Sequence, residues 1–356
     1  MVELNEQMER GKYEHIEYIK KKYTPGKLND ILGKFKNIKV VIIGDAIIDE
    51  YHFVAPKGRA TKDPILSTEY VNQEAYAGGI LAIANHVSNF VDDVLCVTFL
   101  GDREDKKDFI TSAMNKNVRL KFFTKENSPT ITKKRYLDSL RNEKLFKVEY
   151  INDTPISGES EREFMQFLGQ ELPKYDLVIV GDFGHGIITE NVIKVLEEKS
   201  RYLAVNAQCN SSNLGFNYVT RYHLPSFVSI DSYELRYAVA DKFSEVPVLM
   251  KKLHYKAGFK KFLVTMSKRG SGYFNQGAIT FSPAFITRPR DTVGAGDAVF
   301  SIASLFAYIG MDDLIPLMAN CIGGVAVSYL GNKESIDKQK LMEFIDKIYD
   351  GEMQVH

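Results

Sequence analysis

The stretch that decides the fold is residues 288–300, which read RPRDTVGAGDAVF. The small residues at 294–296 are followed by apolar positions at helical spacing, which end at Gly310. This pattern predicts a glycine turn that opens a buried helix, with Gly310 just after its last turn. A helix N-terminus carries unpaired N–H groups and a partial positive charge, and small residues let an anion approach them. Asp297 adds a carboxylate to the first turn, so the stretch combines an anion cradle with a candidate base, as phosphoryl transfer to a hydroxyl requires.

Other interpretations of this stretch fit less well. A Walker A loop needs Lys followed by Ser or Thr after its last glycine, whereas Asp297 and Ala298 stand there. A dinucleotide-binding fingerprint needs a third small residue at the position of Val299, and it should follow the first strand of the chain. The remaining alternative is an ordinary helix N-terminus with an acidic first turn.

The spacing Asp-Thr-x-Gly-Ala-Gly-Asp resembles the signature of the ribokinase-like (PfkB) sugar kinases. The resemblance covers residues 38–345 and is nearest to the heptose-phosphate kinase branch. It implies an ATP-dependent kinase of the ribokinase-like fold, with Asp297 as the catalytic base. The residues that it places around the phosphates are Gly294, Ala295 and Gly296, whose amides would form an anion hole, and Thr292.

Length and charge limit the class of protein. The chain has 356 residues, of which 44% are hydrophobic, enough for one large α/β domain or two small ones. Lys and Arg together number 46, as do Asp and Glu, so the net charge is zero. We therefore expect no nucleic acid and no membrane as a partner.

The cysteines and the N-terminal residues indicate the compartment. Cys96, Cys209 and Cys321 are odd in number and widely separated, which fits neither a disulfide framework nor a zinc pattern. Unpaired thiols are typical of the reducing cytoplasm. Residues 1–22 are dense in charge, unlike a signal peptide, and no apolar run reaches membrane-spanning length. We expect a cytoplasmic protein.

Apolar runs alternate with helical stretches over most of the chain. The runs lie at 39–43, 94–100, 177–180, 203–205, 226–230 and 262–265. Continuous apolar runs between helices predict a doubly wound, mainly parallel sheet flanked by helices. Residues 38–356 would form this kinase domain. Residues 1–37 are polar and helical in pattern, and the resemblance does not cover them. We expect a helical extension packed on the core, and the alternative is a linker from a longer polypeptide.

Two segments, at about 51–76 and 128–150, break this alternation with short half-exposed strands. They predict a small separate β-sheet, which the family resemblance identifies as a lid over the sugar. Both segments carry apolar residues on sheets with free edges. Because unpaired edges tend to be covered and twofold contacts are the commonest assembly, we expect a homodimer through the lid.

Carboxylates at strand ends are the candidate sugar ligands. Asp45 and Asp49 follow the first apolar run, and Asp182 ends a later one. In open α/β sheets, ligands bind at the carboxyl ends of strands. The resemblance implies that an early Asp holds sugar hydroxyls, and the alternative is a set of solvated loop carboxylates.

The paired glycines Gly78 and Gly79 open a further helix and would let a substrate approach the backbone. In the family this pair precedes an Asn that contacts the sugar, but here Ala82 stands at that position. Asn85 lies three residues further, on nearly the same helix face, and is our candidate substitute.

Nucleotide contacts are predicted in the turn that follows the apolar run 262–265. Further contacts are predicted in the helix that comes after the signature helix. A turn in the family that touches the nucleotide corresponds to Thr265, Ser267 and Gly270. The family also places adenine near Asn320 and Gly324. Glycine inside a helix costs about 1 kcal/mol, which points to close packing or to a flat ligand against the helix.

Asp231 and Glu234 stand where the family has Asn-x-x-Glu, a pair that helps to organise Mg²⁺ and its waters. Magnesium prefers oxygen ligands, which these carboxylates provide. The alternative is an acidic helix N-terminus stabilised by the helix dipole. ATP and Mg²⁺ are thus the expected cofactors, and dependence on a monovalent cation stays open.

The predicted function is transfer of the γ-phosphoryl group of ATP to a hydroxyl of a sugar or sugar phosphate. Two alternatives remain. Because Ala82 and Asp231 depart from the family pattern, the chain could be a degenerate binder of sugar or nucleotide. The acceptor could also be a non-sugar hydroxyl, on a nucleoside or vitamin.

Overall fold

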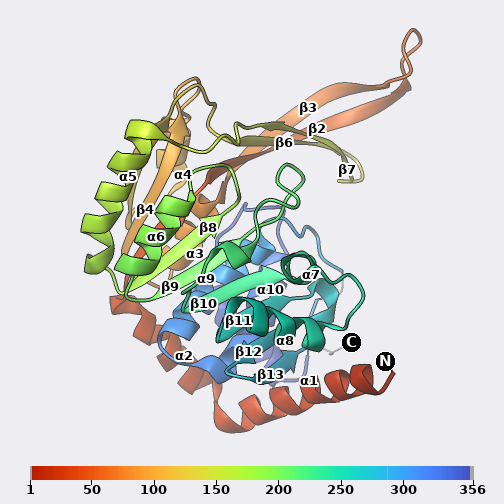
Figure 1. Ribbon diagram of the computed structural model, residues 1–356. Coiled ribbons are helices and arrows are strands. Elements are labelled where there is room, and N and C mark those ends of the chain that lie inside the picture. Colours follow the sequence, from red (N-terminus) through yellow and green to blue (C-terminus); the bar gives the residue numbers. More distant parts are fainter. Residues whose placement is uncertain (1, 287, 353–356) are drawn as a thin grey trace.

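The computed structural model describes residues 2–286 and 288–352. Its centre is a sheet that contains nine strands within these residues (Figure 1). In spatial order they are β13 (Ala278–Ser282), β12 (Ser271–Asn275), β11 (Lys261–Thr265), β10 (Phe227–Asp231), β9 (Leu203–Ala207), β8 (Leu177–Asp182), β1 (Lys39–Gly44), β4 (Asp93–Gly101) and β5 (Val118–Lys125). The pairs β11–β12 and β12–β13 are antiparallel, and all other neighbours are parallel. The predicted doubly wound, mainly parallel sheet is therefore confirmed.

Both faces of this sheet are covered by helices, because alternate residues of each strand point to opposite faces. In β1, Val40 and Ile42 pack on one face and Val41 and Ile43 on the other. The first face carries α2 (Pro25–Gly33), α3 (Ile80–Ser88), α4 (Lys107–Ala113), α9 (Ala295–Tyr308), α10 (Ile315–Ala326) and α11 (Lys338–Tyr349). The second carries α5 (Gly158–Glu171), α6 (Glu190–Lys199), α7 (Ser232–Val239) and α8 (Val246–Ala257). Short 3-10 helices lie at Lys34–Asn37, Leu172–Lys174, Val219–Arg221, Ser267–Arg269 and Asp312–Leu314.

The N-terminal segment is helical and lies against the sheet edge. Helix α1 (Val2–Lys22) runs along β13, the last strand on that side (Figure 1). Ile16 and Ile19 join the core, and Lys22 pairs with Asp313 at 2.6 Å. An uncovered edge strand would expose unpaired N–H and C=O groups, so α1 protects the edge at β13.

A second sheet contains four strands within the described residues and confirms the predicted small β-sheet. Its order is β3 (Leu66–Gly79), β2 (Ala46–Arg59), β6 (Thr132–Asp138) and β7 (Lys144–Tyr150). Strand β2 begins directly after β1, so the second sheet grows out of the carboxyl end of the first. The β2–β3 hairpin projects far beyond the body (Figure 1), and the outer half of β3 is exposed.

The three cysteines are free thiols, of which Cys96 and Cys321 are buried and Cys209 is half-buried. None of the helices in the described ranges is both long and apolar enough to span a membrane.

Candidate active site

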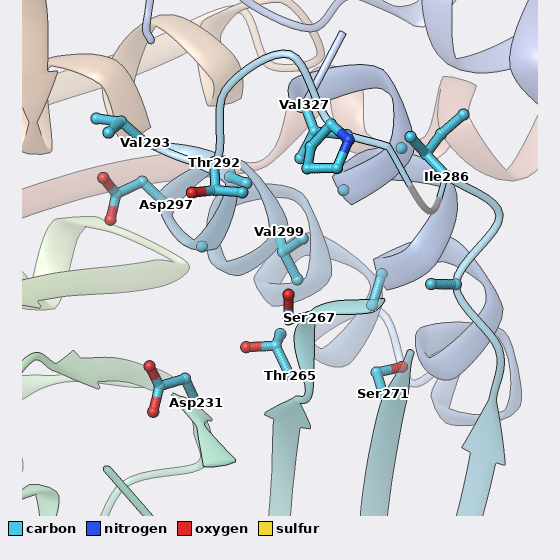
Figure 2. A pocket seen from close by; sticks show the side chains of 18 of the residues that line it. Asp231, Thr265, Ser267, Ser271, Ile286, Thr292, Val293, Asp297, Val299 and Val327 are labelled. Carbon is cyan, nitrogen blue, oxygen red and sulfur yellow. The ribbon is translucent and has the colours of Figure 1, made fainter. Parts of the chain in front are cut away.

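A cavity of about 590 Å³ lies at the carboxyl ends of the large sheet, beneath the four-stranded sheet. Its walls come from the ends of β10 and β11, the loop before α9, helix α10 and the inner face of β6. Figure 2 shows Asp297 and Asp231 at one end of this cavity and the apolar side chains of Ile286 and Val327 at the other. The cavity thus has a charged end and an apolar end.

The loop before α9 ends in a left-handed turn at the cavity wall. Gly294 has φ +80° and precedes the first helical residue, Ala295. A Cβ atom at Gly294 would overlap the side-chain oxygen of Asn332, so only glycine fits there. Ala295 donates a long 3.3 Å hydrogen bond to the carbonyl of Thr292, which closes the turn. The N–H groups of the first turn of α9 consequently face the cavity, which Gly294, Ala295 and Gly296 all line.

Asp297 is buried in the first turn of α9 and lines the same cavity. Burial, and then the nearby negative charge of Asp49, raise its pKa to about 7, while Lys133 opposes this shift. Among the described residues none donates a hydrogen bond to its carboxylate. Asp297 therefore does not cap its helix, and its carboxylate is open to a ligand in the cavity.

Asp49 lies on β2 at the charged end of the cavity. Its carboxylate is paired with Arg135 of β6 and accepts a hydrogen bond from Asn332 Nδ2 at 3.1 Å. A Cβ atom at Gly78 would overlap Asp49 Oδ2. Gly78 thus makes room for this carboxylate and does not line the cavity itself, whereas Gly79 does.

Lys133 and Arg135 are cavity residues that we did not select from the sequence. They lie two positions apart on β6, and residues i and i+2 of a strand share one face. The Lys133 side chain is 8% exposed, and its nearest carboxylate is Glu149 at 3.7 Å, which also binds Lys147 at 2.9 Å. The charge of Lys133 is therefore only partly neutralised within the protein. The sequence carried one signal for them: alternate residues of the strand predicted in the lid face the same side, so Lys133 and Arg135 would both face the sugar.

The predicted nucleotide-binding residues all lie on the cavity. They are Thr265, Ser267, Gly270, Thr292, Asn320 and Gly324. The side-chain nitrogen of Asn320 already donates within the protein, to Ser271 Oγ at 2.9 Å and to the carbonyl of Pro316 at 2.8 Å, which leaves its oxygen for a ligand. Gly324 packs so closely on Phe344 that a Cβ atom would overlap its ring, so close packing explains this helical glycine.

The placement of Asn85 in the substrate site is wrong. Its Nδ2 atom donates to the carbonyl of Ala113 at 2.9 Å, and its Oδ1 atom accepts from the backbone of Asn115 at 3.0 Å. The side chain thereby joins α3 to the segment that follows α4, and it does not line the cavity. A helix-face argument placed it on the correct helix but could not reveal partners from a distant segment.

Asp182 is also structural in its contacts, and Asp45 is so with one of its two oxygens. Asp182 accepts from Tyr222 at 3.0 Å, from Asn217 at 3.1 Å and from Arg221 at 3.3 Å. Burial above all raises its pKa to about 6. Asp45 accepts from the backbone of Phe183 at 3.1 Å. Neither carboxylate lines the cavity, but Asp45 Oδ1 is buried without a hydrogen-bond partner, so its role toward a substrate stays a prediction.

Asp231 and Glu234 form the helix cap that was the alternative to a metal site. Asp231 Oδ1 accepts from the backbone of Tyr233 and of Glu234, both at 2.7 Å. Both oxygens of Glu234 accept backbone N–H groups, from Asp231 at 2.8 Å and from Cys209 at 3.1 Å. Burial and the charge of Asp231 raise the pKa of Glu234 to about 8. Both oxygens of Glu234 are thus used by backbone N–H groups, and its role in organising Mg²⁺ and its waters stays a prediction, whereas Asp231 lines the cavity.

A protein-only magnesium site is not present among residues 2–286 and 288–352, where no three His, Cys, Asp or Glu side chains cluster suitably. Asp231 has one carboxylate oxygen outside the helix cap and facing the cavity. Such a site fits a magnesium ion that arrives with a triphosphate and keeps several waters.

Solved structures share this fold. Arabidopsis thaliana ribokinase, in complex with ribose and ATP, has a TM-score of 0.65 at 16% identity and covers 87% of this chain and 99% of that one. Escherichia coli phosphofructokinase-2, in complex with potassium, has a TM-score of 0.68 at 12% identity. The alignment covers 88% of this chain and 99% of that one. The predicted ribokinase-like fold is thus confirmed.

The sequence comparisons identify the class of protein, a carbohydrate kinase. The model of the pfkB family carbohydrate kinases matches residues 37–307, so the chain belongs to that family. Bifunctional protein HldE of Wolinella succinogenes is 24% identical over 333 residues, which cover 91% of this chain and 68% of the relative. The HldE of Helicobacter pylori is 22% identical over 306 residues, which cover 83% and 64%. The chain therefore spans about two thirds of the length of these relatives.

Proposed function

We propose that this chain transfers the γ-phosphoryl group of ATP to a hydroxyl of a sugar or sugar phosphate. The sugar oxygen forms a bond to the γ-phosphorus, its proton passes to the carboxylate of Asp297, and the bond between the γ-phosphorus and ADP breaks. The observation that carries this proposal is the position of Asp297, buried beside the N–H groups of α9 and open to the cavity.

The other cavity residues take roles that follow from their charges. The first turn of α9 stabilises the negative charge of the transferring group, because positioning and electrostatics supply most of the acceleration in phosphoryl transfer. Asp49 accepts hydrogen bonds from the sugar hydroxyls, and Arg135 holds the carboxylate of Asp49 in place. Magnesium bound with ATP would neutralise phosphate charge next to Asp231. The apolar end, near Ile286 and Val327, receives the base of the nucleotide.

The direct support for an acidic acceptor is Lys133, whose charge faces the cavity with only a 3.7 Å pairing to Glu149. An anionic group on the acceptor would complete this pairing. ADP release should therefore be measured with a panel of free and phosphorylated sugars, nucleosides and vitamins. We expect turnover with a sugar or sugar phosphate. Turnover with a nucleoside or vitamin alone would replace the proposed acceptor class, and no turnover with any acceptor would favour a degenerate binder.

The rate should depend on pH through Asp297, because only the ionised carboxylate can accept a proton. Since its pKa is raised to about 7, kcat/KM should rise with pH through about 7 and then level off. Asp49 raises this pKa and Lys133 lowers it. The midpoint should consequently move to lower pH in Asp49→Asn and to higher pH in Lys133→Met.

Both variants will also lose rate, so the measurement is the midpoint of the pH profile and not its height. Lys134→Met is the matched control, because Lys134 lies beside Lys133 on β6 but pairs with Glu50 at 3.4 Å. A profile with its midpoint near 4, or one that shifts in neither variant, would contradict the assignment of the base.

We also propose that the four-stranded sheet acts as a lid and forms a homodimer. Its edge strands β3 and β7 carry exposed apolar side chains, and the hairpin β2–β3 projects from the body (Figure 1). These side chains are Leu66, Tyr70, Val71, Phe146, Val148 and Tyr150. Light scattering at micromolar concentration should give twice the chain mass, and Tyr70→Glu should shift the population towards monomers. A monomer mass for the unmodified chain would rule out this assembly.

A further inference from the structure

Asp291 connects the loop before α9 to two other segments, although it does not line the cavity. Its Oδ1 atom accepts from the backbone of Thr292 at 2.7 Å and of Val293 at 3.2 Å. Its Oδ2 atom accepts from the backbone of Gly331 at 3.0 Å. The carboxylate therefore holds the turn that leads into the anion-binding N-terminus of α9 and fixes this turn against the segment after α10.

The remaining partners of Asp291 come from the four-stranded sheet. Tyr51 of β2 donates to Oδ2 at 3.1 Å, and Lys144 donates to Oδ1 at 2.6 Å. Tyr51 is fully buried near the start of β2, whereas Lys144 is the first residue of β7, which is an edge strand of that sheet. The Asp291 side chain is 3% exposed, and among the described residues Lys144 forms its only ion pair, while the charge of Arg135 acts on it from a greater distance.

We propose that Lys144 is a positioning residue, which couples the position of the four-stranded sheet to the order of the phosphate-binding turn by neutralising and holding Asp291. The proposal rests on the proposed function and adds to it a link between lid and anion hole. When β7 lies over the body, its ammonium holds the carboxylate that in turn holds the N–H groups of residues 292 and 293. When β7 moves away, a buried carboxylate is left without its ion-pair partner close to the site of a triphosphate.

This unpaired state has a clear cost. A buried charge that loses its partner retains its desolvation penalty, and a negative charge six positions before Asp297 repels phosphates. Either Asp291 turns away and loosens the loop, or it remains and opposes nucleotide binding. Closure of the four-stranded sheet and assembly of the anion hole would thus occur together, so phosphoryl transfer is favoured only under a closed lid.

The test is Lys144→Met in the full chain, with the best acceptor from the panel. Coupling between two sites typically corresponds to about 5–150-fold, and we expect a loss of this size in kcat and kcat/KM together, since the turn matters most in the transition state. Lys144→Arg should restore most of the rate, because a guanidinium can reach the same carboxylate. Lys134→Met removes a charge from the same sheet without touching Asp291, and it should leave kcat unchanged.

A double-mutant cycle separates this role from general destabilisation. If Lys144 acts through Asp291, then Lys144→Met should have no further effect in an Asp291→Asn background. An equal loss in both backgrounds would overturn the proposal. A readout that needs no activity is hydrogen exchange at the amides of Thr292 and Val293, which should be faster in Lys144→Met than in the unmodified chain or in Lys134→Met.

These measurements also separate the two proposals. Faster exchange in Lys144→Met, with an unmodified chain that phosphorylates no acceptor, would keep the coupling and reject the kinase. An active unmodified chain whose Lys144→Met variant has the same kcat, KM and amide exchange would reject the coupling and keep the kinase.

Discussion

Asp297→Asn is expected to reduce turnover by at least two decades while the fold and ATP affinity stay close to those of the unmodified chain. A positioned general base contributes about 10²–10⁴-fold, and Asn has the shape of Asp but cannot take the proton. ATP affinity should be retained because the groups that hold the phosphates are backbone N–H groups. Steady-state kinetics gives the rate, and calorimetry gives the affinity.

The matched control is Asp337→Asn. Asp337 is a true cap, which accepts from the backbone of Lys340 at 2.8 Å at the start of α11. Asn is nearly as good a cap as Asp, so this variant should keep full activity. Equal activity in Asp297→Asn and the unmodified chain would mean that Asp297 has only a structural role in α9.

Gly294→Val should weaken both nucleotide binding and turnover. Gly294 has φ +80°, which a β-branched residue adopts only with strain, and the new side chain would overlap Asn332. Because Asn332 also donates to Asp49, the displacement would reach the sugar end of the cavity as well. A shift of about 1 Å at a reacting centre can cost about 10²-fold, and we expect a loss of this order in kcat/KM together with a measurable loss of ATP affinity.

Gly258→Val separates the steric effect at the cavity from backbone strain. Gly258 has φ +74° after α8, and a Cβ atom there meets nothing within 4 Å. The strain should cost about 1–3 kcal/mol of stability in either variant, measurable by urea unfolding. Only Gly294→Val should lose ATP affinity. Unchanged ATP affinity in Gly294→Val would place the phosphates elsewhere.

Local patterns in the sequence were sufficient for the main architecture. Continuous apolar runs such as 177–180 are buried on both faces of a parallel sheet, and their length and flanking glycines distinguish them from helices. The glycine turn before α9 follows from three small residues and from the helical spacing behind them. These features depend on neighbours in the chain, so the sequence reveals them directly.

The candidate site was predictable only where a residue's neighbours in the chain decide its role. Asp297 and the turn at 294–296 lie on the cavity as expected. Asp182 was misplaced because Arg221 and Tyr222, 39 and 40 positions away, already use its carboxylate. The same limit hid the contact between Lys144 and Asp291, which are 147 positions apart.

The most direct test of the central claim follows the phosphoryl group itself. The chain would be incubated with γ-³²P-ATP, Mg²⁺ and the sugar or sugar phosphate that gives the highest rate of ADP release, and the products would be separated. The account predicts that the label appears on a hydroxyl of the acceptor with the unmodified chain and is reduced by at least about a hundredfold with Asp297→Asn. Label found only in inorganic phosphate, or the same labelling of the acceptor by both proteins, would contradict it.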